Sequence, residues 1–370
     1  MTVQSSDVRP VVTTGRTVAK WFDALQRWRR AHGGGLFLVV MGAIFAALII
    51  LTLITGGTFE AGQQLVNGLQ QGAIYALIAV GYTMVYGIIE LINFAHGDVF
   101  TLSAFYSVLY VGFFGRFFHL DLNALAAGNV GGLIATLAII LPLTMVSAGI
   151  TGMLIERIAY RRLRDAPRLA PLITAIGMSF LLEGIMFAVF GSGNVSTGED
   201  NWLVGVAFRL GPVTVTWVGL FVVVSALVLM LLLQSFIRLS RLGKSMRATA
   251  QNREAALLCG ININRAIAAT FFIGSALAGA GAVIYSMYNG LVKWNLGFQF
   301  GIIAFTAAVL GGIGNIVGAG VGGFLIGLIS VFGGYLIGGE WSNSIIFAML
   351  IVVLVFRPTG LFGTSVADRA

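Results

Sequence analysis

Long apolar segments, separated by short polar ones, recur along almost the whole of this 370-residue chain. A helix needs about 20 predominantly apolar residues to cross a hydrocarbon core about 30 Å thick. Inside that core every backbone N–H and C=O group must be satisfied within the protein, which favours helices for segments of this length. Only 10% of the residues are charged, against about 25% in soluble domains. We therefore expect an all-α integral membrane protein.

Ten apolar segments can be delimited, and they predict eight to ten transmembrane segments. One of them, Phe300–Gly312, would cover only about 20 Å as a helix, so eight full spans plus half-helices fit the pattern almost as well as ten spans. Discontinuous helices are expected in either case. The other segments are Leu36–Thr55, Leu69–Ile92, Val99–Phe114, Gly132–Ile155, Leu169–Phe190, Val213–Leu233, Ala266–Tyr288, a run that reaches Ile337, and Asn343–Phe356.

The basic residues predict the orientation of these segments. Nineteen of the 22 Lys and Arg residues fall into four clusters, and alternate polar connections lack them. The positive-inside rule places the clusters in the cytoplasm together with both termini, and it accounts for the net charge of +8 without nucleic acid. The chain then divides into a basic cytoplasmic extension (1–35), a transmembrane domain (36–356) that contains a cytoplasmic loop (238–265), and a cytoplasmic tail (357–370).

Two further features of composition restrict the possibilities. The aromatic residues of the N-terminal extension suit either a helix on the inner membrane face or a flexible tail. The single cysteine, Cys259, excludes an internal disulfide and offers no metal cluster. No metal site or other cofactor is expected.

A polar interruption follows the second apolar segment. Glu90, Asn93, His96 and Asp98 arrive within nine positions, after which apolar residues resume at Val99. A charged group near the bilayer centre costs about 2.5–3.5 kcal/mol, so it needs water, a partner or a proton. Two interpretations remain open. Either the interruption lines a substrate pathway or gate, with Asp98 capping the next helix, or it is a solvated cytoplasmic turn.

The same segment carries a polar stripe on its first half. Gln71, Tyr75 and Tyr82 are spaced by four and seven residues and therefore share one helix face. Such a stripe faces either the substrate pathway or a neighbouring helix to which it donates hydrogen bonds.

A second interruption is rich in glycine. Gly311, Gly312, Gly314 and Asn315 begin a run to Gly327 in which glycines recur at four-residue spacing. Close helix packing explains this spacing, and a hinge or pathway role is the alternative. Because both interruptions follow segments expected to run inward, we infer an internal inverted repeat of the kind that builds central pathways in transporters.

The loop RLGKSMRATAQNREAALLCGININR is the longest soluble segment inside the transmembrane domain. Gly243-Lys244-Ser245 imitates the end of a phosphate-binding loop, but Arg238 occupies the position of the required first glycine. The chain therefore shows no nucleotide site, and energy for transport must come from a partner or an ion gradient. Asn252 is placed to cap a short helix that ends at Gly260.

Several stretches together resemble the permease subunits of branched-chain amino acid ABC importers, specifically the first of their two related permeases. They are QGAIYALIAVGYTMVYGIIELINFAHGD, the cytoplasmic loop, AFTAAVLGGIGNIVGAGVGGFLIGL and RPTGLFG, and the resemblance covers about residues 62–363. It implies an ABC importer permease fold, a second permease as heterodimer partner, two cytoplasmic ATPases and an external solute-binding protein. Arg253, Glu254, Ala255, Ala256 and Gly260 are similar to the loop motif that couples such permeases to the ATPase.

The expected function is thus inward passage of hydrophobic, branched-chain amino acids through a bacterial inner membrane by a subunit that is not itself an enzyme. Related permeases leave urea, short amides or other amino acids as alternative cargo. An ion-coupled secondary transporter that uses Glu90 or Asp98 is the alternative of another class.

Overall fold

The computed structural model describes residues 13–164, 166–167 and 169–363, which are helical almost throughout. The helices are α1 (Thr13–Ile89), α2 (Ala95–Phe118), α3 (Leu122–Gly128), α4 (Val130–Ile155), the π-helical η1 (Glu156–Tyr160), η2 (Arg161–Leu163), α5 (Leu169–Phe190), η3 (Glu199–Asn201), α6 (Trp217–Leu239), α7 (Arg241–Gln251), α8 (Arg253–Leu258), α9 (Ile263–Asn289), α10 (Leu296–Gly311), α11 (Ile316–Ile337), η4 (Gly339–Trp341) and α12 (Ser342–Phe356). Two small antiparallel sheets pair β1 (Val195–Ser196) with β4 (Leu291–Val292) and β2 (Val206–Leu210) with β3 (Val213–Thr216).

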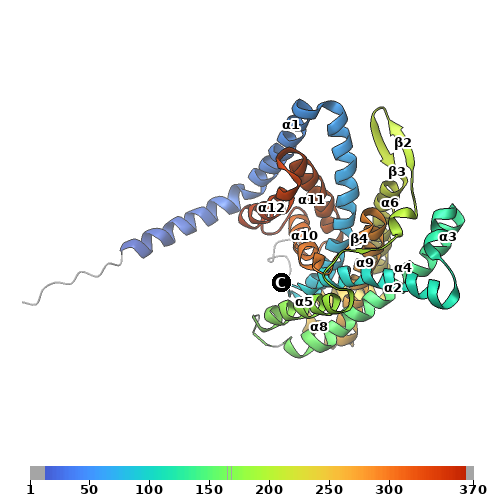
Figure 1. The fold of residues 1–370 in the computed structure, drawn as a ribbon. Helices are drawn as coiled ribbons and strands as arrows, with labels where there is room; N and C mark the ends of the chain where they lie inside the picture. The colour runs from blue at the N-terminus through green and yellow to red at the C-terminus, as the bar shows by residue number, and fades with distance from the viewer. Residues whose placement is uncertain (1–12, 165, 168, 364–370) are drawn as a thin grey trace, which may run out of the picture.

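Eight helices of the described residues are long and apolar enough to cross a membrane. The first of these helices, α1, includes almost all of the first two predicted segments. It turns sharply between them at Gly57 (φ 73°, ψ −174°), as Figure 1 shows. Glycine suits this position because a positive φ is unfavourable for residues with a Cβ atom. The short segment near residue 300 is α10, with 16 residues. Residues 1–12 of the predicted N-terminal extension and 364–370 of the tail lie outside the described residues.

Several predicted boundaries are wrong; α10, for example, begins at Leu296 rather than Phe300, and two further cases have a physical reason. The segment expected to begin at Val213 begins instead at Trp217, because the alternating Val-Thr-Val-Thr forms β3 after a turn at Gly211. The interruption expected at Asn93–Asp98 is Glu90–Phe94, and α2 already begins at Ala95. In the first case β2 pairs with the chain before the helix, and in the second α2 includes His96 and Asp98 because both are buried in the bundle.

Close backbone contact joins the second half of α1 to α11, which run antiparallel. A Cβ atom on Gly327 would lie 2.2 Å from Gly72 Cα, and one on Gly323 would lie 2.3 Å from Ala76 Cα. Small residues allow such approach in lipid, where packing rather than hydrophobic burial drives helix association. The predicted packing role of the glycine run is therefore confirmed for this pair of helices. Around them, α9 packs on α1, α2 and α4, and α10 packs on α2 and α11.

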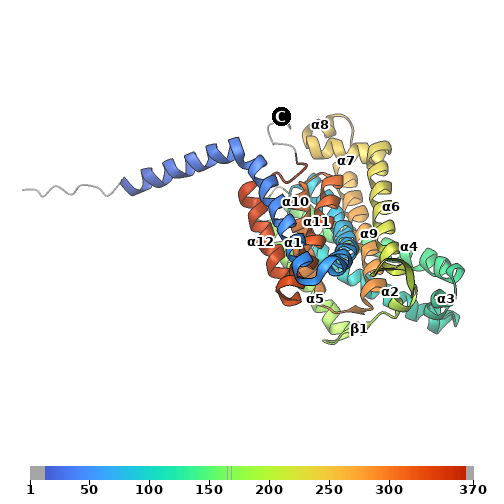
Figure 2. The same cartoon turned by 90° about the horizontal axis from the view of Figure 1, so that it is seen from above.

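The helices form a bundle with two distinct ends, which Figure 2 shows edge-on. We call the end that carries α7 and α8 the basic end, because Arg164, Arg238, Arg253 and Arg357 all lie there, joined by contacts around the end of α1 and the loop before α11. The opposite end, which carries α3 and the short strands, is called the strand end.

Substituting Gly327 tests the contact between α1 and α11. Because a Cβ atom there would meet backbone rather than a movable side chain, we expect Gly327→Ala to destabilise the folded protein by about 1–3 kcal/mol. The measurement is thermal unfolding of the purified protein in detergent. Gly112→Ala is the matched control, because an added Cβ there would have no atom within 4 Å beyond its own stretch of helix. Equal stability of the two variants would contradict the contact.

Candidate functional site

The two helix interruptions lie side by side at the basic end. The backbone N–H of Gly314 donates to Thr83 Oγ1 at 2.9 Å, and a Cβ atom on Gly87 would lie 3.1 Å from Gly314 Cα. The first interruption follows Ile89, where Glu90 has a left-handed backbone (φ 56°). The structure thus brings together two of the predicted groups of site residues.

The glycines of the second interruption serve turns and backbone contact. Gly312 (φ 107°) and Gly314 (φ 86°) adopt conformations that favour glycine. Asn315 caps α11 by accepting a hydrogen bond from Gly318 N at 3.0 Å, and its Nδ2 donates to the Phe362 carbonyl at 3.1 Å. A Cβ atom on Gly311 would lie 2.0 Å from the Gly318 carbonyl oxygen. The C-terminal turn therefore closes over this loop.

The polar residues of the first interruption have separate environments. Glu90 is exposed, whereas Asn93 is buried and accepts a hydrogen bond from Tyr160 at 3.0 Å. His96 is buried against Tyr82, with ring centroids 5.8 Å apart, and neither imidazole nitrogen has a hydrogen-bond partner among the described residues. Asn93 and His96 therefore face neighbouring helices rather than an open passage.

Asp98 does not cap a helix, contrary to the expectation from the sequence. It lies within α2, is fully buried, and accepts a hydrogen bond from Ser179, the eleventh of the 22 residues of α5. A Cβ atom on Gly297 would lie 1.9 Å from Asp98 Oδ1. The chain after the interruption thus re-enters the bundle, and Asp98 is level with the middle of α5 instead of the basic end.

The predicted polar stripe on α1 divides into two parts. Gln71 Nε2 donates to the Tyr75 hydroxyl at 2.6 Å, and both residues line a cavity of about 200 Å³ near the strand end. Tyr82 packs instead on His96 and Phe305.

Sequence reasoning missed the far wall of this cavity. The close spacing of two tyrosines before Asn289 is a signal that could have found part of it. The remaining polar and aromatic lining residues are Tyr285, Tyr288, Asn289, Gln299 and Phe300.

The connection between α6 and α9 forms the short helix that the sequence predicts. Asn252 caps α8 by accepting from Ala255 N at 2.9 Å, and Gly260 (φ 78°) follows its end. Ala256 is the residue of α8 that is buried in the bundle. Arg253 is half-buried, and the other four residues of α8 are exposed, including Glu254 and Leu258, the latter 91% accessible. Leu257 beside it is 58% accessible, so this six-residue helix presents two adjacent exposed apolar side chains at the basic end.

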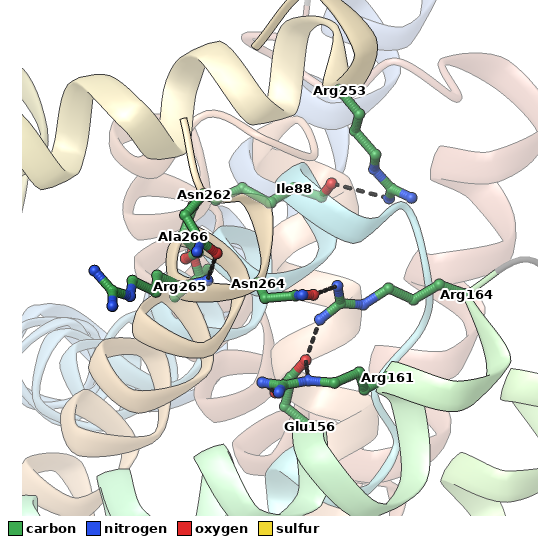
Figure 3. A network of polar contacts seen from close by, with 10 residues as sticks. Ile88, Glu156, Arg161, Arg164, Arg253, Asn262, Asn264, Arg265 and Ala266 are labelled. Atoms are coloured by element: carbon green, nitrogen blue, oxygen red, sulfur yellow. Dashed lines mark hydrogen bonds and ion pairs between the residues drawn. The ribbon is translucent and has the colours of Figure 1, made fainter. Parts of the chain in front are cut away.

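Arginines connect α8 and the α4–α5 connection to the ends of other helices, as Figure 3 shows. Arg253 Nη2 donates to the carbonyls of Ile88 at 3.3 Å and Ile89 at 3.1 Å, the last two residues of α1. Arg253 borders a cavity of about 420 Å³ that is also lined by Glu90 and Arg164.

On the far side of that cavity, Glu156 is fully buried and is paired with two arginines. Arg161 Nη2 lies 2.8 Å from Glu156, and Arg164 bonds both Glu156 and Asn264 of α9, the latter at 2.6 Å. Burial lowers the pKa of Arg164, and the charge of Glu156 opposes this shift. Through Glu156 and Asn264, Arg164 therefore fixes the end of α4 against the start of α9.

Comparison with known proteins assigns the chain to a family. The model of the branched-chain amino acid transport system permease component matches residues 64–354. The permease protein BraD of the high-affinity branched-chain amino acid transport system of Pseudomonas aeruginosa is 41% identical over 317 residues, covering 83% of this chain and 97% of BraD. The corresponding permease LivH of Escherichia coli is 40% identical over 312 residues, with the same coverage.

A more distant relative, the ribose import permease RbsC of Escherichia coli, is 24% identical over 80% of this chain and 85% of RbsC. No solved structure matches significantly. The membrane-length helices and the short helix between α6 and α9 agree with these matches. Their extent and identity show that the chain belongs to the permease-component family of branched-chain amino acid transport systems.

Proposed function

We propose that this permease passes branched-chain and other hydrophobic amino acids inward across a bacterial plasma membrane. The observation that carries the proposal is the 41% identity with BraD over nearly the whole of that relative. Two cytoplasmic ATPases supply the energy, a second related permease completes a heterodimer, and an external binding protein delivers the substrate. The permease needs no cofactor of its own, because ATP is used by its partners.

The basic end is the cytoplasmic side in this proposal. Three clusters of arginines meet there, while the isolated basic residues Arg116, Arg209 and Lys293 belong to the strand end. The positive-inside rule then puts α7 and α8 in the cytoplasm and the strands outside. With the four basic clusters inside, both termini are cytoplasmic.

The short helix α8 is the contact with an ATPase. Glu254 and Leu258 are exposed on it, and its capped ends make it a rigid element. Arg253 and Ala256 belong to the same helix but face the permease. The predicted coupling motif thus has one face for the partner and one face for the bundle.

The substrate pathway begins at the cavity bordered by Gln71 and Tyr75. Its volume of about 200 Å³ is on the scale of one amino acid, and its lining combines aromatic rings with amide and hydroxyl groups. Phe300, which lines the cavity, packs on Phe100 with ring centroids 4.9 Å apart. The inward route then passes the adjoining interruptions, which we regard as the counterparts of an inverted repeat.

Uptake by the reconstituted complex tests this function and its alternatives. Proteoliposomes that contain the permease with its partner permease and ATPases should accumulate leucine when ATP and the binding protein are present. Accumulation of urea, a short amide or ribose in place of leucine would show that the transported solute is not a branched-chain amino acid. Uptake driven by a proton or sodium gradient without ATPases would establish the secondary transporter instead.

The exposed leucine of α8 provides a test of the ATPase contact. Leu258→Glu places a charge where an apolar contact is proposed, so we expect at least about a tenfold loss of ATPase copurification, equivalent to about 1.4 kcal/mol. Leu239→Glu is the control, because Leu239 is also exposed at the basic end (78%) but lies outside α8. Equal copurification with both variants would remove α8 from the contact.

The cavity is tested by removing one hydroxyl. Tyr75→Phe deletes the hydrogen bond to Gln71, and we expect the KM for leucine uptake to rise about threefold to tenfold, as for loss of one hydrogen bond. Tyr110→Phe is the control, because its hydroxyl bonds Ser147 away from the cavity. An unchanged KM in Tyr75→Phe would place the pathway elsewhere.

A further inference from the structure

The cytoplasmic end of α1 has an unusual partner for its free carbonyl groups. The last four C=O groups of a helix lack partners within the helix, and the helix dipole favours a cation beside them. In α1 the carbonyls of Ile88 and Ile89 accept hydrogen bonds from the guanidinium of Arg253, which is 165 and 164 residues away in sequence. The first residue of α8 thereby caps the end of α1.

This capping is the direct polar link between α8 and a membrane helix. Ala256 is the residue of α8 buried against the bundle, and the remaining backbone and cap bonds of α8 are local. Within the described part of the chain, Arg253 alone provides side-chain hydrogen bonds from α8 to another helix. A displacement of α8 therefore reaches the bundle chiefly through this side chain and the short covalent connections at its ends.

The end of α1 is in turn joined to the second interruption. Thr83 accepts the hydrogen bond from Gly314 N, and Gly87 packs on Gly314 one turn later. The loop that contains Gly314 separates α10 from α11. A movement of the α1 terminus is therefore transmitted to both interruptions rather than to one.

The surroundings of Arg253 leave its side chain room to move relative to the carbonyls of α1. Its side chain borders the cavity of about 420 Å³, and its bonds go to neutral carbonyls. Across the cavity Arg164 is fixed by Glu156 and Asn264, and it repels Arg253 electrostatically. Arg253 thus has space to move, whereas Arg164 is held.

We propose that Arg253 is a positioning residue that couples α8 to the terminus of α1, so that the ATPase-driven displacement of α8 moves the polar interruption at Glu90–Phe94. The inference rests on the proposed function, in which α8 contacts the ATPase. Arg253 does not itself contact the ATPase in this proposal, because its guanidinium points into the permease (Figure 3). Glu254 and Leu258 hold the partner, and Arg253 transmits the motion.

The test measures ATP hydrolysis and leucine uptake on the same reconstituted complex. We expect Arg253→Ala to lower the leucine taken up per ATP about tenfold, within the usual range of coupling between sites, while ATPase copurification stays native. Arg253→Lys, which keeps a cation and donors without the planar fork, should recover part of the ratio. Arg265→Ala is the matched control, because Arg265 is exposed and its side chain points away from α1 (Figure 3).

A distance measurement separates transmission of motion from mere structural support. Cys259 is exposed at the end of α8 and is the single cysteine of the chain. A spin label there, paired with one at Leu91→Cys in a complex whose other subunits lack cysteine, reports the distance between α8 and the interruption. With Arg253 present the two labels should keep their separation between nucleotide-free and ATP-bound states, whereas in Arg253→Ala the separation should change.

Each outcome decides the proposal. A native uptake-to-ATP ratio in Arg253→Ala, or label distances that respond to ATP equally with and without Arg253, would overturn it. If Arg253→Ala fails to assemble, Arg253→Gln and Arg253→Lys take its place: both keep donors that support assembly but lack the planar fork, so the uptake-to-ATP ratio should fall in part, and a native ratio in both would overturn the proposal. If the native complex takes up no leucine but another solute, the proposed cargo fails, and the same ratio measured with that solute still tests Arg253.

Discussion

Backbone contact between α1 and α11 is the constraint on which the rest of the bundle depends. In lipid, apolar side chains gain little by leaving the hydrocarbon for one another, so helix association relies on close van der Waals packing. Gly72 with Gly327 and Ala76 with Gly323 provide that approach at four-residue spacing along α1. The same antiparallel alignment continues to Gly87 and Gly314. Two interruptions more than 200 residues apart in sequence meet because these two helices are in register.

Much of this arrangement could be predicted from the sequence, because hydropathy and helix geometry act locally. The apolar segments, the glycine packing and the short helix after Asn252 depend on residues within one or two turns of one another. The boundary at Val213 failed because local alternation favours a strand there. The position of Asp98 could not be predicted, since it depends on Gly297 and Ser179 of other helices, which allow α2 to begin earlier and deeper than its polar residues suggest.

Candidate site residues were harder to place than helices, because a shared helix face does not specify what lies opposite. Gln71 and Tyr75 border a cavity, whereas Tyr82, on the same face, packs on His96. Arg253 illustrates the same difficulty: its sequence context resembles an ATPase-coupling motif, but its partners are carbonyl groups of α1. A comparable case at the strand end is Glu199 of η3, which is fully buried, and burial raises its pKa to about 8.

The left-handed backbone of Glu90 has a mechanical consequence. A residue with a Cβ atom that is held at φ 56° stores on the order of 1–3 kcal/mol relative to ordinary helical or extended backbone. This strain lies directly beside the two carbonyls that Arg253 caps, so the strained residue and the capped ones are consecutive in the chain. Glu90 is therefore the position at which the displacement of the α1 terminus proposed above would meet the least backbone resistance.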